Sequence, residues 1–291
     1  MKQHFLIQQN HKRLLLFFAG WGMDARPFCS FQPKDCDWMI CYDYRSAEFN
    51  VEALENYSEI IVIGWSMGVW VASEVMPLHP ELPIKGSLAI NGTPYPIDDQ
   101  KGIPSAIYEG TLEGLNDSTL QKFQRRMCGS SAGYQTFQQT APQRPIEELK
   151  EELIKIRERY LSSTLRRHSK LSNRTLDSDQ SEQIIESNQT EQIIESKQSK
   201  QIIDSDQTID FNLSNNFNHS IAPNESNKID RSDDSIESIP DAFRWECAIV
   251  GKADRIFPTA NQLEAWSNQA ERIEQVNEPH YSHELFSQIF S

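Results

Sequence analysis

The segment GWSMG places Ser66 between Gly64 and Gly68, the G-x-S-x-G pattern of a serine nucleophile held in a sharp turn. The apolar, β-branched run 60–63 comes just before it and predicts a strand buried on both faces, and residues 67–76 predict a helix. A strand, a tight turn and a helix form a nucleophile elbow, in which the two glycines leave room for neighbouring backbone. The helix also directs its positive N-terminal dipole at the serine. The alternative is an ordinary strand–turn–helix whose serine has no special role.

A serine hydroxyl is a weak nucleophile and needs a base, which a third group orients. In this type of site the chain order is nucleophile, acid, base. Asp254 lies in the loop after the apolar run 245–251, where the acid is expected, and only His280 and His283 follow it. We favour His280 as the base, because His283 falls at the start of the last predicted helix and is expected to be exposed. Neither histidine fits a metal-binding motif, so we expect no metal and no cofactor.

Acyl transfer also needs two N–H donors directed at the developing oxyanion. The backbone of Met67, the residue after the serine, supplies one in this type of site. The glycine-containing loop 20–24 follows a predicted strand, and the backbone N–H of Trp21 is the candidate for the other. The alternative is a plain glycine turn. Asp24 precedes Ser66 in the chain, so we interpret it as a turn or helix-capping residue and not as the acid.

Alternating strand and helix patterns predict an α/β-hydrolase fold with a mostly parallel central sheet. We expect the first two strands, 5–7 and 14–19, to form a hairpin that turns at residues 10–11. Residues 104–168 change to helical patterns, with one helix starting near Ser118 and another over Ile146–Leu165, which is typical of a helical cap. The remaining strands are expected at 38–44, 60–63, 88–90, 245–251 and 273–276.

Residues 169–240 differ in composition from the rest of the chain. Three nine-residue repeats begin at Glu182, Glu191 and Lys200, and a stretch rich in Ser, Asn and Asp follows. A β-solenoid or a short coiled coil is one interpretation, but three copies are few for a solenoid. We favour a disordered insertion, because so little apolar area cannot offset the entropy of ordering. The predicted parts of the chain are therefore a core at 1–103 and 241–291, a cap at 104–168, and the insertion at 169–240.

The net charge of the 291-residue chain is -14, and -8 of it falls between Lys170 and Ile239, which contain 14 acidic and 6 basic residues; -6 remains elsewhere. Such acidity argues against non-specific nucleic-acid binding and against docking on anionic membranes. The longest apolar run, 14–19, is too short to span a membrane, and the first residues do not resemble a signal peptide. The five cysteines form no CxxC pair, so we expect reduced thiols and a cytoplasmic location.

Five segments, the serine motif among them, are more specific in combination than that motif alone. They read FFAGWGMD (17–24), YDYR (42–45), GWSMG (64–68), NGTP (91–94) and KFQRRMCG (122–129). Together they resemble the pimeloyl-acyl-carrier-protein methyl ester esterases of biotin synthesis, in the compact form that often lies beside the pathway's methyltransferase. The resemblance covers 1–168 and 243–291. It implies a serine hydrolase that removes a methyl ester from the pimeloyl chain, with the residue roles given above.

The resemblance also implies an acyl carrier protein as partner, and such carriers are acidic. Arg125 and Arg126 lie in a predicted cap helix, and a local basic patch can steer an acidic partner despite an unfavourable net charge. The alternative is a solvated helix face. Other functions stay open: a carboxylesterase or thioesterase of different substrate, a hydrolase-fold binding protein without activity, or an adhesion or scaffold role for the repeats. Further arginines of the predicted patch stand at 157, 159, 166 and 167.

Overall fold

A single mixed sheet forms the centre of the protein. The computed structural model describes residues 1–179, 202–204 and 242–290. The strands follow the order β1-β3-β2-β4-β5-β7-β8-β6 across the sheet. β1 is antiparallel to β3, and every other neighbouring pair is parallel, so the mostly parallel sheet expected from the sequence is confirmed. The strands are β1 (Lys2–Ile7), β2 (Arg13–Phe18), β3 (Asp37–Tyr42), β4 (Glu59–Trp65), β5 (Ile84–Ile90), β6 (Ile202–Asp204), β7 (Trp245–Gly251) and β8 (Ala270–Val276).

The middle strands β2 and β4 are buried on both faces. The side chains of residues 14–18 and 60–63 are at most 2% exposed. Continuous apolar runs are what a parallel strand covered by helices on both sides requires. The strand that leads to Ser66 is therefore fixed in the most buried part of the molecule.

The prediction that the first two strands form a hairpin is wrong. β1 pairs with β3, placing His4 opposite Ile40, while β2 pairs in parallel with β3 on one edge and β4 on the other. Because both edges of β2 are occupied, β1 cannot pair with it, and β1 joins the sheet at the outer edge of β3. Its side chains are exposed or half-buried, as an edge strand allows.

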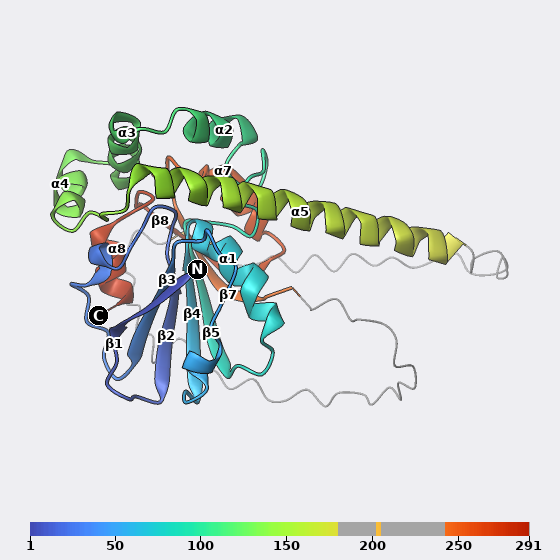
Figure 1. Cartoon of the computed structure of the whole chain (residues 1–291), viewed down its shortest axis with the longest axis horizontal. Helices are drawn as coiled ribbons and strands as arrows, with labels where there is room; N and C mark the ends of the chain where they lie inside the picture. The colour runs from blue at the N-terminus through green and yellow to red at the C-terminus, as the bar shows by residue number, and fades with distance from the viewer. Residues whose placement is uncertain (180–201, 205–241, 291) are drawn as a thin grey trace.

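The helices α1, α7 and α8 pack against strands of the sheet (Figure 1). α1 (Met67–Val75) lies on β4 and β2, and α7 (Thr259–Trp266) lies on β7 and β8. From α8 (His283–Ile289), the Phe286 ring lies 6.2 Å from that of Phe17 in β2. Short 3-10 helices occur at η1 (Arg26–Phe28), η2 (Glu52–Leu54) and η3 (Met76–Leu78).

The helical cap covers one end of the sheet, above α1 in Figure 1. It consists of α2 (Ser105–Glu113), α3 (Asp117–Cys128), α4 (Ser131–Gln139) and α5 (Ile146–Asp179). α3 begins one residue before the expected Ser118, because the side chain of Asn116 caps it by accepting the N–H groups of Ser118 and Thr119.

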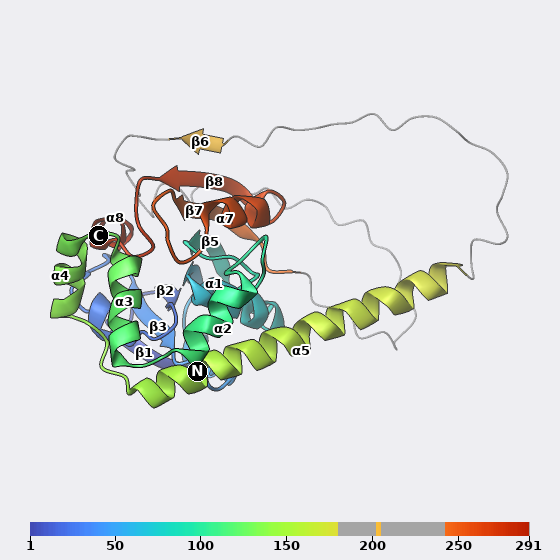
Figure 2. The ribbon, with the colours of Figure 1, turned by 90° about the horizontal axis from the view of Figure 1, so that it is seen from above.

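α5 is longer than the expected helix Ile146–Leu165. It continues to Asp179 and projects beyond the rest of the molecule in both ribbon views (Figures 1 and 2). Its last turns and β6 fall inside the segment 169–240 that we expected to be disordered. The remainder of that segment, 180–201 and 205–240, lies outside the described residues.

None of the helices in the described ranges is long and apolar enough to cross a membrane. All five cysteines are free thiols, and only Cys29 is exposed. Within the same ranges, no group of three His, Cys, Asp or Glu side chains is placed to hold a metal ion.

Candidate active site

Ser66 lies at the turn between β4 and α1 with φ 58° and ψ -125°, a backbone conformation that residues other than glycine rarely adopt. The flanking glycines make this turn possible. A Cβ at Gly68 would lie 2.0 Å from the carbonyl oxygen of Phe18, and one at Gly64 would lie 2.8 Å from the Val69 backbone. The strained turn presents the serine hydroxyl at the end of the sheet, as the GWSMG motif predicts.

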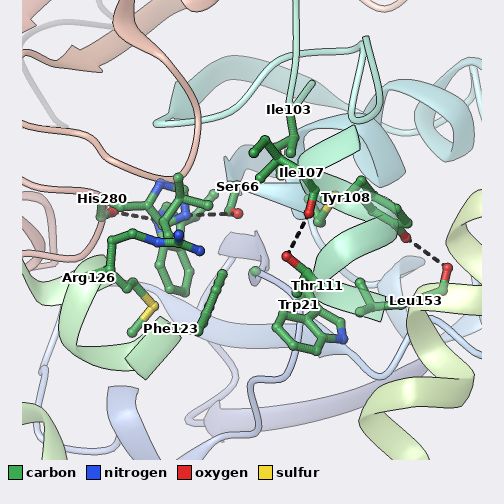
Figure 3. Close-up of a pocket in the computed structure, with 15 residues that line it drawn as sticks. Trp21, Ser66, Ile103, Ile107, Tyr108, Thr111, Phe123, Arg126, Leu153 and His280 are labelled. Atoms are coloured by element: carbon green, nitrogen blue, oxygen red, sulfur yellow. Dashed lines mark hydrogen bonds between the residues drawn. The ribbon is translucent and has the colours of Figure 1, made fainter. Parts of the chain in front are cut away.

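Ser66, His280 and Asp254 lie in one line of hydrogen bonds. His280 Nε2 is 2.9 Å from Ser66 Oγ (Figure 3), and His280 Nδ1 is 2.8 Å from Asp254 Oδ2. All three residues are buried. With its proton on Nδ1, facing the carboxylate, His280 can accept the serine proton at Nε2. His283 is exposed on α8 and contacts Ser287.

Asp254 is held in place by donors from its own loop and from α7. Its Oδ1 accepts the backbone N–H groups of Ile256 at 2.7 Å and Phe257 at 3.0 Å. Its Oδ2 accepts from the fully buried Gln262 at 3.0 Å as well as facing His280. These bonds fix the orientation of the carboxylate toward the imidazole. Gln262 belongs to no sequence motif, so its role could not be predicted from the sequence.

Asn91 connects the loops that carry the acid and the base. Its side-chain nitrogen donates to the carbonyls of Pro279 and His280, both at 3.0 Å, and its side-chain oxygen accepts the N–H of Gly251 at 2.7 Å. Trp65 donates to the same His280 carbonyl at 2.9 Å. In the sequence, Asn91 stands out only as part of the NGTP segment 91–94. Its φ of 45° is one that asparagine tolerates better than most residues.

The loop after β2 packs directly against the nucleophile. A Cβ on Gly20 would lie 3.1 Å from Ser66 Cβ, and the Met23 N–H to Gly20 carbonyl bond of 3.4 Å closes a turn in which Gly22 has φ 77°. In the described part of the chain, neither the Trp21 nor the Met67 backbone N–H takes part in the hydrogen bonds found between loops and turns. The role of these two N–H groups as oxyanion donors stays a prediction.

The pocket above Ser66 is mainly apolar (Figure 3). It contains about 520 Å³ of space, counted out to its solvent-facing mouth. The hydroxyls of Tyr108 and Thr111 donate to the carbonyls of Leu153 and Ile107, at 2.7 and 2.8 Å, so they present little polarity to a ligand. The apolar part of the wall includes Trp21, Ile103, Ile107, Phe123, Leu153 and Ile256.

The two arginines predicted for carrier docking face different places. Arg126 lines the Ser66 pocket, with its guanidinium 5.8 Å from the Phe123 ring centre. Arg125 lies 5.0 Å from the Tyr134 ring centre and lines a second hollow between α3 and α4. Neighbouring residues on a helix point about 100° apart, which separates them.

Other arginines of the predicted basic patch serve the cap itself. Arg157 pairs with Glu109 at 2.6 Å. Arg159 donates to the Tyr44 carbonyl at 3.0 Å and lies over the Trp70 ring. The side chains at 166 and 167 lie outside the described ones. Arg157 and Arg159 are therefore engaged in contacts within the protein.

The family model described as "Pimeloyl-ACP methyl esterase BioG" matches residues 1–210. The chain belongs to the BioG family. A crystal structure of BioG from Haemophilus influenzae is similar over the whole of both chains, with 26% sequence identity and a TM-score of 0.64. Asp254 and His280 lie beyond the range matched by the family model, but the structural similarity to BioG includes that part of the chain.

A curated relative from Bacteroides fragilis (strain 638R) bears the name malonyl-[acyl-carrier protein] O-methyltransferase. It is 39% identical over 277 residues, which are 95% of this BioG-family chain and 41% of the relative. The chain thus spans about two fifths of that relative's length. A hydrolase from Pseudomonas aeruginosa shares the fold at 11% identity, with 99% and 90% of the two chains covered and a TM-score of 0.53. The α/β-hydrolase fold expected from the sequence is confirmed.

Proposed function

We propose that this BioG-family protein is a serine esterase that hydrolyses the methyl ester of a pimeloyl group carried by an acyl carrier protein. The observation that carries the proposal is the hydrogen-bonded line Ser66–His280–Asp254 beneath an apolar pocket. The product is the free pimeloyl carboxylate needed for biotin synthesis, the pathway to which the family belongs.

The reaction follows from the positions of the polar groups. His280 Nε2 takes the proton of Ser66 Oγ as the oxygen attacks the ester carbonyl, and Asp254 stabilises the imidazolium that forms. The backbone N–H groups of Trp21 and Met67 stabilise the oxyanion. His280 then protonates the leaving methoxide, methanol departs, and water hydrolyses the acyl-enzyme by the same route. No metal or other cofactor is needed in this scheme.

The pocket fits an unbranched acyl chain better than a charged or strongly hydrated substrate. Its walls are mainly apolar, and its Tyr108 and Thr111 hydroxyls are already bonded to backbone carbonyls. The methylene chain of a pimeloyl ester would bury its surface there, at roughly 0.8 kcal/mol for each CH₂.

We place the acidic carrier against α3, where Arg125 and Arg126 are exposed. Each guanidinium lies over an aromatic ring, that of Tyr134 or Phe123, and its exposed position allows it to meet acidic groups of a partner. Arg126, at the pocket, would meet the portion of the carrier or its arm that enters the site. We further propose a cytoplasmic location, on the basis of five unpaired cysteines.

The Bacteroides relative is named for a methyltransferase activity, but the part that matches this chain is 41% of that protein. We therefore do not assign methyltransferase activity to this chain. Two other functions share the observed geometry. A carboxylesterase or thioesterase of other substrate would use the same triad, and an inactive binding protein would keep the fold without turnover.

A test by complementation separates the proposal from both alternatives. The gene should restore biotin-free growth to a bacterial strain lacking its pimeloyl-ester esterase, and the Ser66→Ala gene should not. Growth with neither gene, while the purified protein still reacts with a fluorophosphonate at Ser66, would indicate a hydrolase of other substrate. No labelling at all would indicate a binding protein.

A further inference from the structure

A buried carboxylate lies behind the loop that carries Trp21. Glu152, on α5, has 0% exposure and takes no part in the proposed reaction. Its Oε1 accepts the Tyr44 N–H at 2.8 Å, and its Oε2 accepts the Gly22 N–H at 3.3 Å and Arg144 Nη1 at 2.7 Å. Burying a carboxylate is costly unless such donors surround it.

The same face of the cap fixes the rest of the turn. The indole N–H of Trp21 donates to the Leu149 carbonyl on α5 at 2.9 Å, and Arg144 Nη1 donates to the Met23 carbonyl at 3.3 Å. Trp21 is thus held by its side chain, and Gly22 and Met23 are held by their backbone groups. Contacts from the cap therefore hold the turn at the Trp21 side chain and at the two residues that follow it.

The charges in this cluster depend on one another. Arg144 is 5% exposed and bridges Glu152 to Asp43, whose Oδ1 lies 2.9 Å from Arg144 Nη2. Burial raises the pKa of Glu152, and the Arg144 charge opposes that rise. Burial also opposes ionisation of Asp43, but hydrogen bonds from Arg45 and Lys2 and the Arg144 charge together hold the pKa of that carboxyl well below its usual value. Neither Glu152 nor Arg144 belongs to a sequence motif.

We propose that Glu152 is a positioning residue for the oxyanion hole: it holds the turn 20–23, and with it the Trp21 N–H, in the orientation that stabilises the transition state. The proposal rests on the serine esterase function proposed above. α5 is then a fixed support of the active site, and its contribution to activity is separate from any role of the cap in binding a carrier.

Glu152→Gln tests this with almost no change in shape. The amide replaces one carboxylate oxygen by an NH₂ group, which must face an N–H donor and leaves that donor without an acceptor. For a small methyl ester we expect kcat to fall roughly 10–100-fold, less than the roughly 10²–10³-fold for complete loss of an oxyanion donor, with KM within about twofold. Affinity for a boronic acid that forms a tetrahedral adduct at Ser66 should fall in parallel.

Glu158→Gln is the matched control, because Glu158 lies exposed on the same helix and pairs with Lys155 of that helix at 2.9 Å. Its kcat should be that of the unmodified protein. Glu152→Asp keeps the charge and both oxygens, so it should recover part of the lost kcat. If the glutamine variant does not fold, Glu152→Asp alone is measured, and a lowered kcat with unchanged KM supports the proposal.

An unchanged kcat in a folded Glu152 variant, or a loss that appears only in KM, would overturn the positioning role. A shift of the acid limb of the pH–rate profile would overturn it too, because that would locate the damage at His280. Ser66→Ala is measured in parallel. If the unmodified protein shows no turnover that depends on Ser66, the esterase proposal fails, and this result is distinct from failure of the Glu152 inference.

Discussion

At the scale of single residues, the site depends on polar groups whose partners lie far apart in the chain. Ser66, Asp254 and His280 could be predicted, because the G-x-S-x-G pattern and the order nucleophile, acid, base leave few candidates. Asn91 and Glu152 could not. Asn91 contacts residues 160 to 189 positions away, and nothing in the residue type distinguishes it from a turn asparagine.

The choice between the two histidines is directly testable. His280→Ala should lower esterase turnover by roughly 10⁴-fold or more, because it removes the group that takes the Ser66 proton. His283→Ala should have turnover near that of the unmodified protein, since His283 is exposed and contacts Ser287 on its own helix. Steady-state assays with a small methyl ester measure both. Comparable losses in the two variants would refute the assignment.

Asn91→Ala should lower both stability and kcat. It leaves the buried Gly251 N–H and carbonyls of the His280 loop with fewer partners, at roughly 1–3 kcal/mol for each unpaired group. We expect the free energy of unfolding to fall by at least about 2 kcal/mol in urea titrations. Asn261→Ala is the control, because Asn261 also donates to two carbonyls, those of Asp99 and Gly102, but is less buried. Equal losses of stability and kcat in both variants would mean that Asn91 has no particular role in connecting the loops of the acid and the base.

At the scale of elements, the pattern of apolar residues predicts which segments form strands and helices. It does not predict which strands pair with one another. The central strands, the elbow helix and the cap follow from periodicity, and α3 starts within one residue of its expected position. The hairpin prediction failed because it assumed that neighbours along the chain pair in the sheet. Instead, β3 and β4 pair in parallel with β2 and occupy both of its edges. The half-exposed side chains of β1 already indicate an edge strand.

The elbow makes a prediction about two helix glycines. Gly68→Ala should prevent folding or cost at least about 4 kcal/mol, since its Cβ would lie 2.0 Å from the Phe18 carbonyl oxygen. Gly110→Ala, in α2, meets no atom within 4 Å and should stabilise the protein by about 0.5–1 kcal/mol through helix propensity. Thermal unfolding of the two variants checks this. A stable, active Gly68→Ala protein would contradict the elbow geometry.

Substitutions on the cap helix α3 should distinguish the effect of carrier docking from the effect of contacts in the pocket. Arg125→Glu should lower kcat/KM about tenfold for a carrier-bound ester, with a smaller loss at high salt, and should spare a small free ester. Arg126→Glu should affect both esters, because Arg126 lines the pocket. Lys85→Glu, an exposed change at the start of β5, controls for net charge. If Arg125→Glu behaves like the control, the carrier docks elsewhere.

At the scale of the whole molecule, the active site is assembled by elements on both sides of the segment 169–240. Ser66 and the cap precede it, and Asp254 and His280 follow it. The composition of that segment predicts that it contributes little to the core. Replacing residues 172–238 by a Gly/Ser linker should therefore change the free energy of unfolding by no more than about 1 kcal/mol and leave kcat intact. A large loss of folded protein would show that the repeats, including β6 on the edge of β8, are structural.

The central claim is that Ser66 attacks the methyl ester at the far end of the acyl chain, and one intermediate reports on it. Attack there releases methanol and joins the enzyme to the carrier through the pimeloyl chain, whereas attack at the thioester releases the carrier thiol and leaves only the acyl group on the enzyme. Rapid quenching with intact-mass analysis distinguishes the two adducts. We predict a covalent enzyme–pimeloyl–carrier species at Ser66, with methanol release, that is absent from Ser66→Ala. An acyl-enzyme without the carrier, or methanol release that persists in Ser66→Ala, would contradict the account.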